Sequence, residues 1–279
     1  MRIALLLFHL SFVPLLAAET AIQVGDTTIT VPTPSGFTPV TKDMATLDRF
    51  LETFVTPDNV RFISFIPEEL LPAVQSGQFP QMPRTLSLQT NKKVVTRTMT
   101  TSNFKELKAT LRKQNIEMVK EIEKKMPGLM ESVNKKVEGQ FNAKLDMNIN
   151  GIVPLPPHEE GERSMASSAL LNFTMTTPDG QKTNYHGVVT TTFLHARGKL
   201  FFTYVNGGEN DLSWSRQVAK DWTTAILAAN PSDQATIAKE SMRSGGFDWG
   251  RILRNTVIGG LIGGAFGLIR YLFRRTSTK

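Results

Sequence analysis

Two apolar segments lie at the ends of this 279-residue chain, and they confine any folded body to the residues between them. Residues 1–18 start with Met-Arg, continue as a mostly apolar run and end in Ala17-Ala18. A basic start, a short apolar core and small residues at the end are typical of a signal peptide. We therefore expect export of the chain with cleavage after Ala18, and an uncleaved N-terminal anchor is the alternative.

The second apolar segment, residues 251–273, predicts a transmembrane helix. At 1.5 Å per residue, the stretch 252–273 would extend about 33 Å, enough to cross a hydrocarbon core of roughly 30 Å. An interfacial helix and a buried glycine-rich core helix are the alternatives. The residues that we expect to hold the helix at the two interfaces are aromatic or basic: Trp249, Arg251, Arg254, Arg270, Tyr271, Arg274 and Arg275.

Five glycines of this segment lie on adjoining stripes of one helix face: Gly259, Gly260, Gly263, Gly264 and Gly267. Small residues four positions apart let a second helix backbone approach closely. We therefore expect the chain to self-associate through the glycine face of its transmembrane helix.

The two ends together predict a single-pass protein of the cell membrane. A signal peptide would place residues 19–229 outside the cytoplasm, followed by a linker over residues 230–250. The short basic tail, residues 274–279, would remain inside, as the positive-inside rule prefers. Membrane lipid is then a partner, and the main domain is periplasmic if the source is a Gram-negative bacterium.

The net charge of +7 lies at the ends of the chain rather than in its body. Of the 32 basic residues, one lies in residues 1–18 and six lie in residues 251–279, which leaves 25 to balance the 25 acidic residues. Clustered Lys and Arg supply most of the affinity of proteins for a phosphate backbone. The neutral body therefore argues against a nucleic-acid partner.

Between the two ends, the hydrophobic pattern predicts an α+β body. Helical spacing predicts short helices over residues 44–54 and 212–227, and a long helical segment over residues 103–144. Asn103 and Glu106 resemble a capping box at its start, and Pro127 predicts a kink or a break. Residues 22–31 predict a short hairpin or a bent strand. The other predicted strands are the segments 60–66, 84–90, 93–100, 146–155, 164–176, 181–196 and 199–206.

The long helical segment has an apolar stripe and a face crowded with Lys and Glu. Core packing of the stripe with a solvated charged face is the simpler interpretation. An arm that binds a protein partner along helices 104–141 is the alternative.

The order of strands, central helix, antiparallel meander and C-terminal helix resembles the PsbP-like family. The supporting residues are Ile29-Thr-Val-Pro-Thr-Pro-Ser-Gly-Phe37 and the stretch 199–227, and the resemblance covers about residues 22–228. It implies an αβ sandwich, in which an antiparallel sheet packs with helices. The long helical segment would be an insert in that fold, and the membrane anchor would be an addition to it. That family has no shared catalytic motif, so the resemblance implies a fold and no chemistry.

The sequence has no motif for catalysis, for a cofactor or for a metal ion. The absence of cysteine excludes disulfides and thiolate sites. His158 begins the acidic stretch His-Glu-Glu-Gly-Glu162, which has too few ligands for a metal site. His186 and His195 are nine residues apart and would face opposite sides of one strand. We therefore expect a non-enzymatic, membrane-anchored interaction or assembly factor of the envelope, and the alternative is an anchored hydrolase or small-ligand-binding module that uses the meander face.

Overall fold

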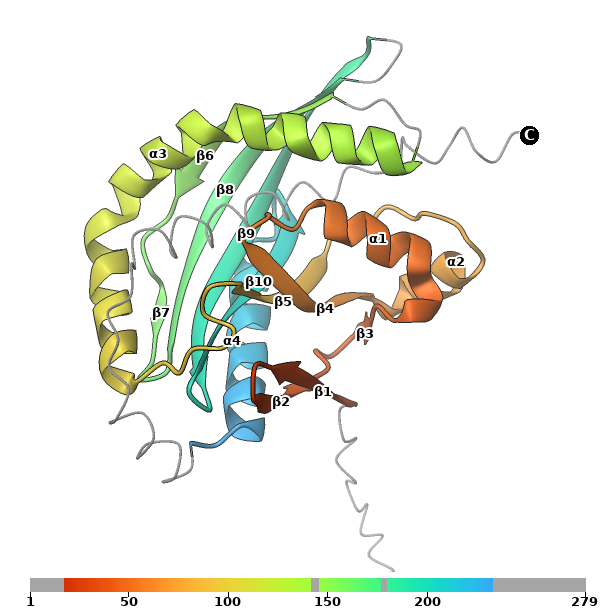
Figure 1. The fold of residues 1–279 in the computed structure, drawn as a ribbon. Helices are drawn as coiled ribbons and strands as arrows, with labels where there is room; N and C mark the ends of the chain where they lie inside the picture. The colour runs from red at the N-terminus through yellow and green to blue at the C-terminus, as the bar shows by residue number, and fades with distance from the viewer. Residues whose placement is uncertain (1–17, 142–145, 177–179, 233–279) are drawn as a thin grey trace, which may run out of the picture.

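The computed structural model describes residues 18–141, 146–176 and 180–232 (Figure 1). These residues form an α+β fold around one antiparallel sheet, as the sequence predicts. The strands lie in the order β3-β4-β5-β10-β9-β8-β6, and the short β7 also pairs with β8. Their bounds are β3 (Phe37–Pro39), β4 (Asn59–Pro67), β5 (Thr85–Asn91), β6 (Asp146–Pro154), β7 (Glu159–Glu160), β8 (Ser164–Thr176), β9 (Lys182–Ala196) and β10 (Lys199–Gly208).

Two helices cover one face of the sheet, which we call the inner face. They are α1 (Ala45–Thr53), which follows the short helix η1 (Lys42–Met44), and α3 (Thr101–Phe141). Their apolar residues share one hydrophobic core with the sheet, for example Phe50 of α1, Phe104 of α3 and Phe202 of β10. The apolar residues of α3 within 104–111 and 122–137 are thus packed in the core, and α3 is a layer of the body. The small η2 (Glu68–Leu70) and α2 (Leu71–Gln75) flank the same core.

The opposite, outer face is covered by α4 (Leu212–Ala229) and by the hairpin of β1 (Glu19–Val24) and β2 (Thr27–Pro32). A second hydrophobic core fills this layer, with Ile29 of the hairpin, Phe65 of β4 and Trp222 of α4 among its buried residues. Trp222 Nε1 donates a hydrogen bond to the Pro32 carbonyl at 2.9 Å. The predicted hairpin and closing helix are therefore present and pack together.

The start of α3 is capped three residues earlier than the sequence suggests. Thr100 Oγ1 accepts a hydrogen bond from the Asn103 amide at 3.0 Å, and Asn103 Oδ1 accepts one from the Thr100 amide at 3.1 Å. This reciprocal pair is a capping box with Thr100 at the N-cap. Pro127 lies inside the single helix α3, which curves over the sheet without a break (Figure 1).

Residues 93–97 form turns and a bend, and residues 98–100 have no regular secondary structure. The prediction of a strand over 93–100 is therefore wrong. The amides of Val94 and Arg97 donate to the carbonyls of Asn91 and Val94 at 2.9 and 3.1 Å. The reason is topological, because β5 already has β4 on one side and β10 on the other. No position beside β5 is left for a strand that follows it directly.

The predicted meander is confirmed in β6, β8, β9 and β10, whose bounds differ from the expected ones by at most two residues. Arg197 and Gly198 form the tight turn between β9 and β10 with φ of 48° and 71°. At the free edge of the sheet, the Asn134 side chain of α3 bonds both main-chain groups of Met147 in β6, at 3.1 and 3.2 Å. This contact occupies the edge of β6 at that point.

The signal peptide, most of the linker, the transmembrane segment with its glycines and flanking residues, and the basic tail lie outside the described residues. None of the helices in the described ranges is long and apolar enough to cross a membrane.

Candidate functional site

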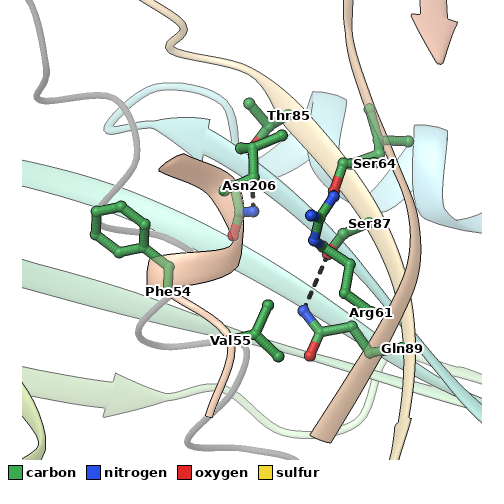
Figure 2. A pocket seen from close by; sticks show the side chains of 10 residues that line it. Phe54, Val55, Arg61, Ser64, Thr85, Ser87, Gln89 and Asn206 are labelled. Carbon is green, nitrogen blue, oxygen red and sulfur yellow. Dashed lines mark hydrogen bonds between the residues drawn. The ribbon is translucent and has the colours of Figure 1, made fainter. Parts of the chain in front are cut away.

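Polar side chains from three neighbouring strands form the floor of the inner face beneath α1. Arg61 and Ser64 come from β4, Ser87 and Gln89 from β5, and Asn206 from β10. With Leu51, Phe54 and Val55 of the α1 region they enclose a pocket of about 20 Å³ (Figure 2). We call this group the α1 pocket.

A β-bulge turns Arg61 toward the inner face. Arg61 is opposite Gln89 of β5, whereas Ile63, two residues on, is opposite Leu88. Strict alternation would place Arg61 and Ile63 on the same face, and the extra residue in β4 changes this. Ile63 therefore packs in the outer core while Arg61 lies under α1.

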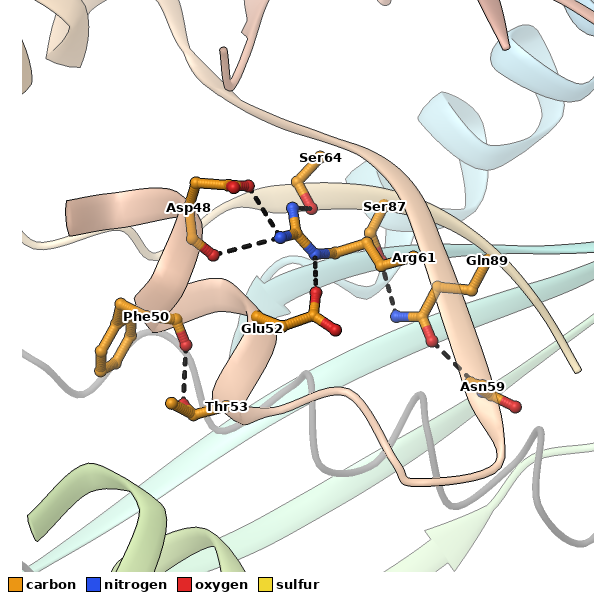
Figure 3. A network of polar contacts seen from close by, with 9 residues as sticks. All are labelled: Asp48, Phe50, Glu52, Thr53, Asn59, Arg61, Ser64, Ser87 and Gln89. Carbon is orange, nitrogen blue, oxygen red and sulfur yellow. Dashed lines mark hydrogen bonds and ion pairs between the residues drawn. The ribbon is translucent and has the colours of Figure 1, made fainter. Parts of the chain in front are cut away.

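The Arg61 guanidinium joins β4 to α1 (Figure 3). Nη2 lies 2.7 Å from the Asp48 carboxylate and 3.1 Å from the Asp48 carbonyl, and Nε lies 3.1 Å from the Glu52 carboxylate. Nη1 donates to Ser64 Oγ at 3.3 Å. The Arg61 side chain is only 9% exposed, so its charge is used within the fold.

Amides and hydroxyls continue the network along the floor. Asn59 Nδ2 donates to Gln89 Oε1 at 3.2 Å, and Gln89 Nε2 donates to Ser87 Oγ at 3.4 Å. Burial raises the pKa of Tyr204, against the opposing effect of a hydrogen bond with Asn59. Burial thus favours the neutral phenol of Tyr204.

The α1 pocket has room for about one water molecule, far less than the several hundred Å³ of a typical small-molecule site. Its arginine is paired with two carboxylates. The arrangement fastens α1 to the sheet, and it offers no space for an organic substrate.

A second polar region lies on the outer face, where β6, β8 and β9 extend beyond α4. Within the described part of the chain, α4 contacts this face through Ser215, which bonds Thr190 of β9, and Arg216, which bonds Ser168 of β8. Beyond these contacts Val188 of β9 is still buried, and the outward side chains further along β6, β8 and β9 are exposed or half-buried. We call this region the open face: Asp146, Asn148, Asn150, Asn172, Thr174, Thr176, Lys182, Asn184 and His186.

Hydrogen bonds connect side chains across the open face. Thr174 Oγ1 donates to Asn184 Oδ1 at 2.7 Å and accepts a bond from Asn150 Nδ2. His186 Nδ1 lies 2.6 Å from Asn172 Oδ1. The region is mostly neutral, with one acid, Asp146, on its β6 edge and one base, Lys182, on its β9 edge. Figure 1 shows the ends of β8 and β9 extending away from α4.

The histidines considered in the sequence do not form a shared site. His186 and His195 lie on opposite faces, as predicted: His186 is exposed on the open face, and His195 is buried at the inner face, with Nε2 2.9 Å from the Met99 carbonyl. His195 stacks on Phe104 of α3 at 5.6 Å between ring centroids. These contacts are structural.

The acidic stretch after His158 is used in packing. Glu159 and Glu160 form β7, where Glu159 pairs with Lys220 of α4 and Glu160 with Lys108 of α3. Burial and the charge of Arg216 lower the pKa of His158, against the opposing effect of Glu159. The described residues contain no group of three or more His, Asp or Glu side chains that could hold a metal ion.

Over residues 104–111 and 122–137, the apolar stripe of α3 is buried in the inner core, so this part of it is not exposed to a partner. A partner on helices 104–141 would have to contact the charged outer side, for example Lys105, Lys113 and Lys124, which are exposed. The α1 pocket was not predicted from the sequence. The open face lies within the meander face that the alternative of a hydrolase or ligand-binding module would use, but its set of polar residues was not predicted. Alternation within 164–176 and 182–196 contained the signal for the open face, since polar residues outnumber apolar ones at the outward positions of that end.

The described body is thus an αβ sandwich with helices on both faces of an antiparallel sheet. No protein-family model matches the chain, and no curated protein matches it. The chain is similar to the solution structure of cyanobacterial PsbP (CyanoP) from Synechocystis sp. PCC 6803, with a TM-score of 0.29 and 11% sequence identity. The match covers 80% of this chain and 96% of that chain, and it is to the family that the sequence resembles. Nothing about function follows from a likeness at this TM-score.

Proposed function

We propose that this chain is a membrane-anchored extracytoplasmic domain that acts by contact with another macromolecule, as an interaction or assembly factor of the envelope. The observation that carries the proposal is the open face. It spans three strands, and its middle consists of amides, hydroxyls and one imidazole. Depletion of charge in the centre of a surface is a feature of protein interfaces.

The charged groups elsewhere in the body support this choice, because the most buried of them are satisfied within the fold. Arg61 is paired with Asp48, Lys108 with Glu160, and Lys199 with Asp26. The membrane anchor of the proposal comes from the sequence of residues 251–273.

The anchor is tested by deletion of residues 251–279. The truncated chain should be secreted as a soluble body, because the apolar segment is removed. If it still partitions with membranes after a high-salt wash, the single-anchor proposal fails, and an uncleaved N-terminus becomes the first explanation.

The contact surface is tested by photo-crosslinking in the native membrane. A photoreactive residue at Asn184 of the open face should give specific adducts with protein. The same residue at Lys124 of α3, exposed on the opposite side of the body, is the matched control. Equal adducts from both positions would reject the open face as the contact surface.

A further inference from the structure

We propose that the open face binds a second copy of this chain, packed face to face about a two-fold axis that runs parallel to β8. The inference rests on the proposed function, because it names the partner of that surface. Closed two-fold symmetry is the commonest arrangement of soluble homo-oligomers, and it requires a self-complementary surface.

The charges of the open face are self-complementary about β8. Asp146 of β6 and Lys182 of β9 both pair with Thr176 of β8, so these three residues form one row across the strands. Neighbouring strands are about 4.8 Å apart, so the acid and the base lie at similar distances on the two sides of β8. A two-fold axis along β8 exchanges the two edges and sets each Asp146 against the Lys182 of the other copy.

The side chains nearest the axis also suit a copy of themselves. Asn172 and Thr174 lie on β8, in the middle of the open face. An amide and a hydroxyl can each both donate and accept hydrogen bonds. Thr174 Oγ1 already bonds Asn184 and Asn150, and Asn172 Oδ1 already bonds His186. Pairing across the axis therefore exchanges bonds within one copy for bonds between copies, and it brings no like charges together.

The direction of the axis agrees with two chains anchored in one membrane. The end of α4 lies beside the start of β8, since Arg163 donates to the carbonyls of Asn230 and Leu227 at 3.2 and 3.4 Å. Thr174 lies near the other end of β8, about 34 Å further on at 3.4 Å per residue. An axis parallel to β8 keeps both copies of Asn230 at the same end of the dimer, whereas an axis across the strands would send them to opposite ends.

The area of the open face determines how strong the contact between two copies should be. Three strands and five residues of length correspond to about 250 Å² per copy, against about 800 Å² per partner in a standard interface. The contact should therefore be weak between free bodies. Two-dimensional confinement by the anchors supplies the local concentration that such a contact needs. The experiment consequently uses the full-length chain in the membrane.

Cysteine crosslinking tests the geometry directly, because the natural chain has no cysteine. Thr174→Cys places a single thiol near the axis, where the two copies should meet, and oxidation should give a disulfide-linked dimer. Thr176→Cys, on the same strand, is a second variant in case the first fails to fold. Lys124→Cys on α3 is the control, and it should give at least about fivefold less dimer.

Exchange of the two charges distinguishes a contact through the open face from a contact through the transmembrane helix. In the Thr174→Cys chain, Asp146→Lys or Lys182→Asp alone should lower the dimer yield about three- to tenfold, since each creates two like-charge contacts. Both changes together should restore it. Failure of the double exchange to restore the dimer overturns the proposal, as does equal crosslinking of Thr174→Cys and Lys124→Cys.

The outcomes also distinguish this proposal from the function on which it rests. Adducts from Asn184 with a different protein, without a Thr174→Cys dimer, would keep the interaction function and reject the second copy. Adducts with residues 233–279 of the same chain would show that the chain covers its own open face, and would reject both.

Discussion

The Lys199 ammonium lies 2.9 Å from the carboxylate of Asp26, although the two residues differ widely in exposure. The Lys199 side chain is 3% exposed and that of Asp26 is 83% exposed. Lys199 Nζ also lies 3.4 Å from the carbonyls of Val95 and Arg97. The pair therefore fastens the turn of the β1–β2 hairpin to the segment between β5 and α3.

Asp26→Asn should lower the free energy of unfolding by about 1 kcal/mol at pH 7, because Lys199 would keep only neutral carbonyl partners. Its hydrogen bond with Lys199, and then the lysine charge, hold the pKa of Asp26 below its usual value of 3.8. A lowered pKa stabilises the fold above the unfolded value, and the effect is lost as the pH falls through the folded value.

Denaturant unfolding of the full chain in detergent, repeated at several pH values, measures this effect. The difference between the wild type and Asp26→Asn should close as the pH falls below 3.8. Asp43→Asn, an equal change at an exposed position of η1, is the control. A difference that persists in strong acid would mean that the ion pair is not its cause.

Local pattern predicts the elements of this fold well, and tertiary context decides the rest. The strands from Asp146 onward were predictable because they alternate and end at turn residues such as Gly198. Residues 93–100 alternate as well, yet they form no strand because both sides of β5 are occupied. The place of Arg61 depends on a bulge, and strict alternation assigns that residue to the wrong face.

For the open face, alternation indicates which residues point outward but not which of them a helix covers. Exposed polar residues on a strand are common and do not by themselves indicate a site. The residues of the open face are left uncovered by α4 because α4 is shorter than β8 and β9. That relation between helix and sheet is not a property of any one segment.

Thr100→Ala should cost about 1 kcal/mol of stability, as expected for the loss of an N-cap. Asn103→Ala removes the other half of the capping box, so the double variant should cost less than the sum of the two single variants. Thr110→Ala is the control within α3, where alanine favours the helix. Additive costs in the unfolding cycle would contradict the reciprocal pair.

Arg61→Lys should destabilise the chain by about 1–2 kcal/mol even though the charge is kept. A single ammonium cannot reproduce the forked contacts of Arg61 with Asp48, Glu52 and Ser64. Arg49→Lys, at an exposed position of α1, should have little effect. Equal stability of Arg61→Lys and wild type would show that the guanidinium geometry does not hold α1 in place.

His158 should make the stability fall as the pH drops below its ordinary pKa of 6.5. Neither ring nitrogen has a hydrogen-bond partner among the described residues, and burial lowers the pKa of His158 from its usual 6.5. The folded state then holds fewer protons than the unfolded state near pH 6, so stability falls as the pH is lowered. Because the residue is only partly buried, we expect less than about 1 kcal/mol.

His158→Phe should remove this part of the pH dependence and leave the rest, as followed by thermal unfolding at several pH values. His186→Gln is the control, because His186 is exposed on the open face. An unchanged slope in His158→Phe would assign the pH dependence to other groups.

Gly263→Leu should weaken self-association of the proposed transmembrane helix by roughly 1–2 kcal/mol without loss of membrane insertion. On a helix, Gly259, Gly263 and Gly267 repeat at about 6 Å, and a leucine would fill the groove between them. Ala265 lies on the opposite side of that helix at 100° per residue, so Ala265→Leu is the matched control. A transmembrane reporter assay on residues 249–279 measures the association of this segment alone.

Gly263→Leu also distinguishes the two surfaces through which two copies could pair, the glycine face of the transmembrane helix and the open face. If both contribute, Gly263→Leu should lower the Thr174→Cys dimer in the membrane only in part, because confinement by the anchor still brings open faces together. The reporter signal from residues 249–279, which lacks the open face, should fall further. If Gly263→Leu and Ala265→Leu give the same reporter signal, the glycines are not a contact surface. A dimer would then have to form through the open face, and the charge exchange at Asp146 and Lys182 tests that contact.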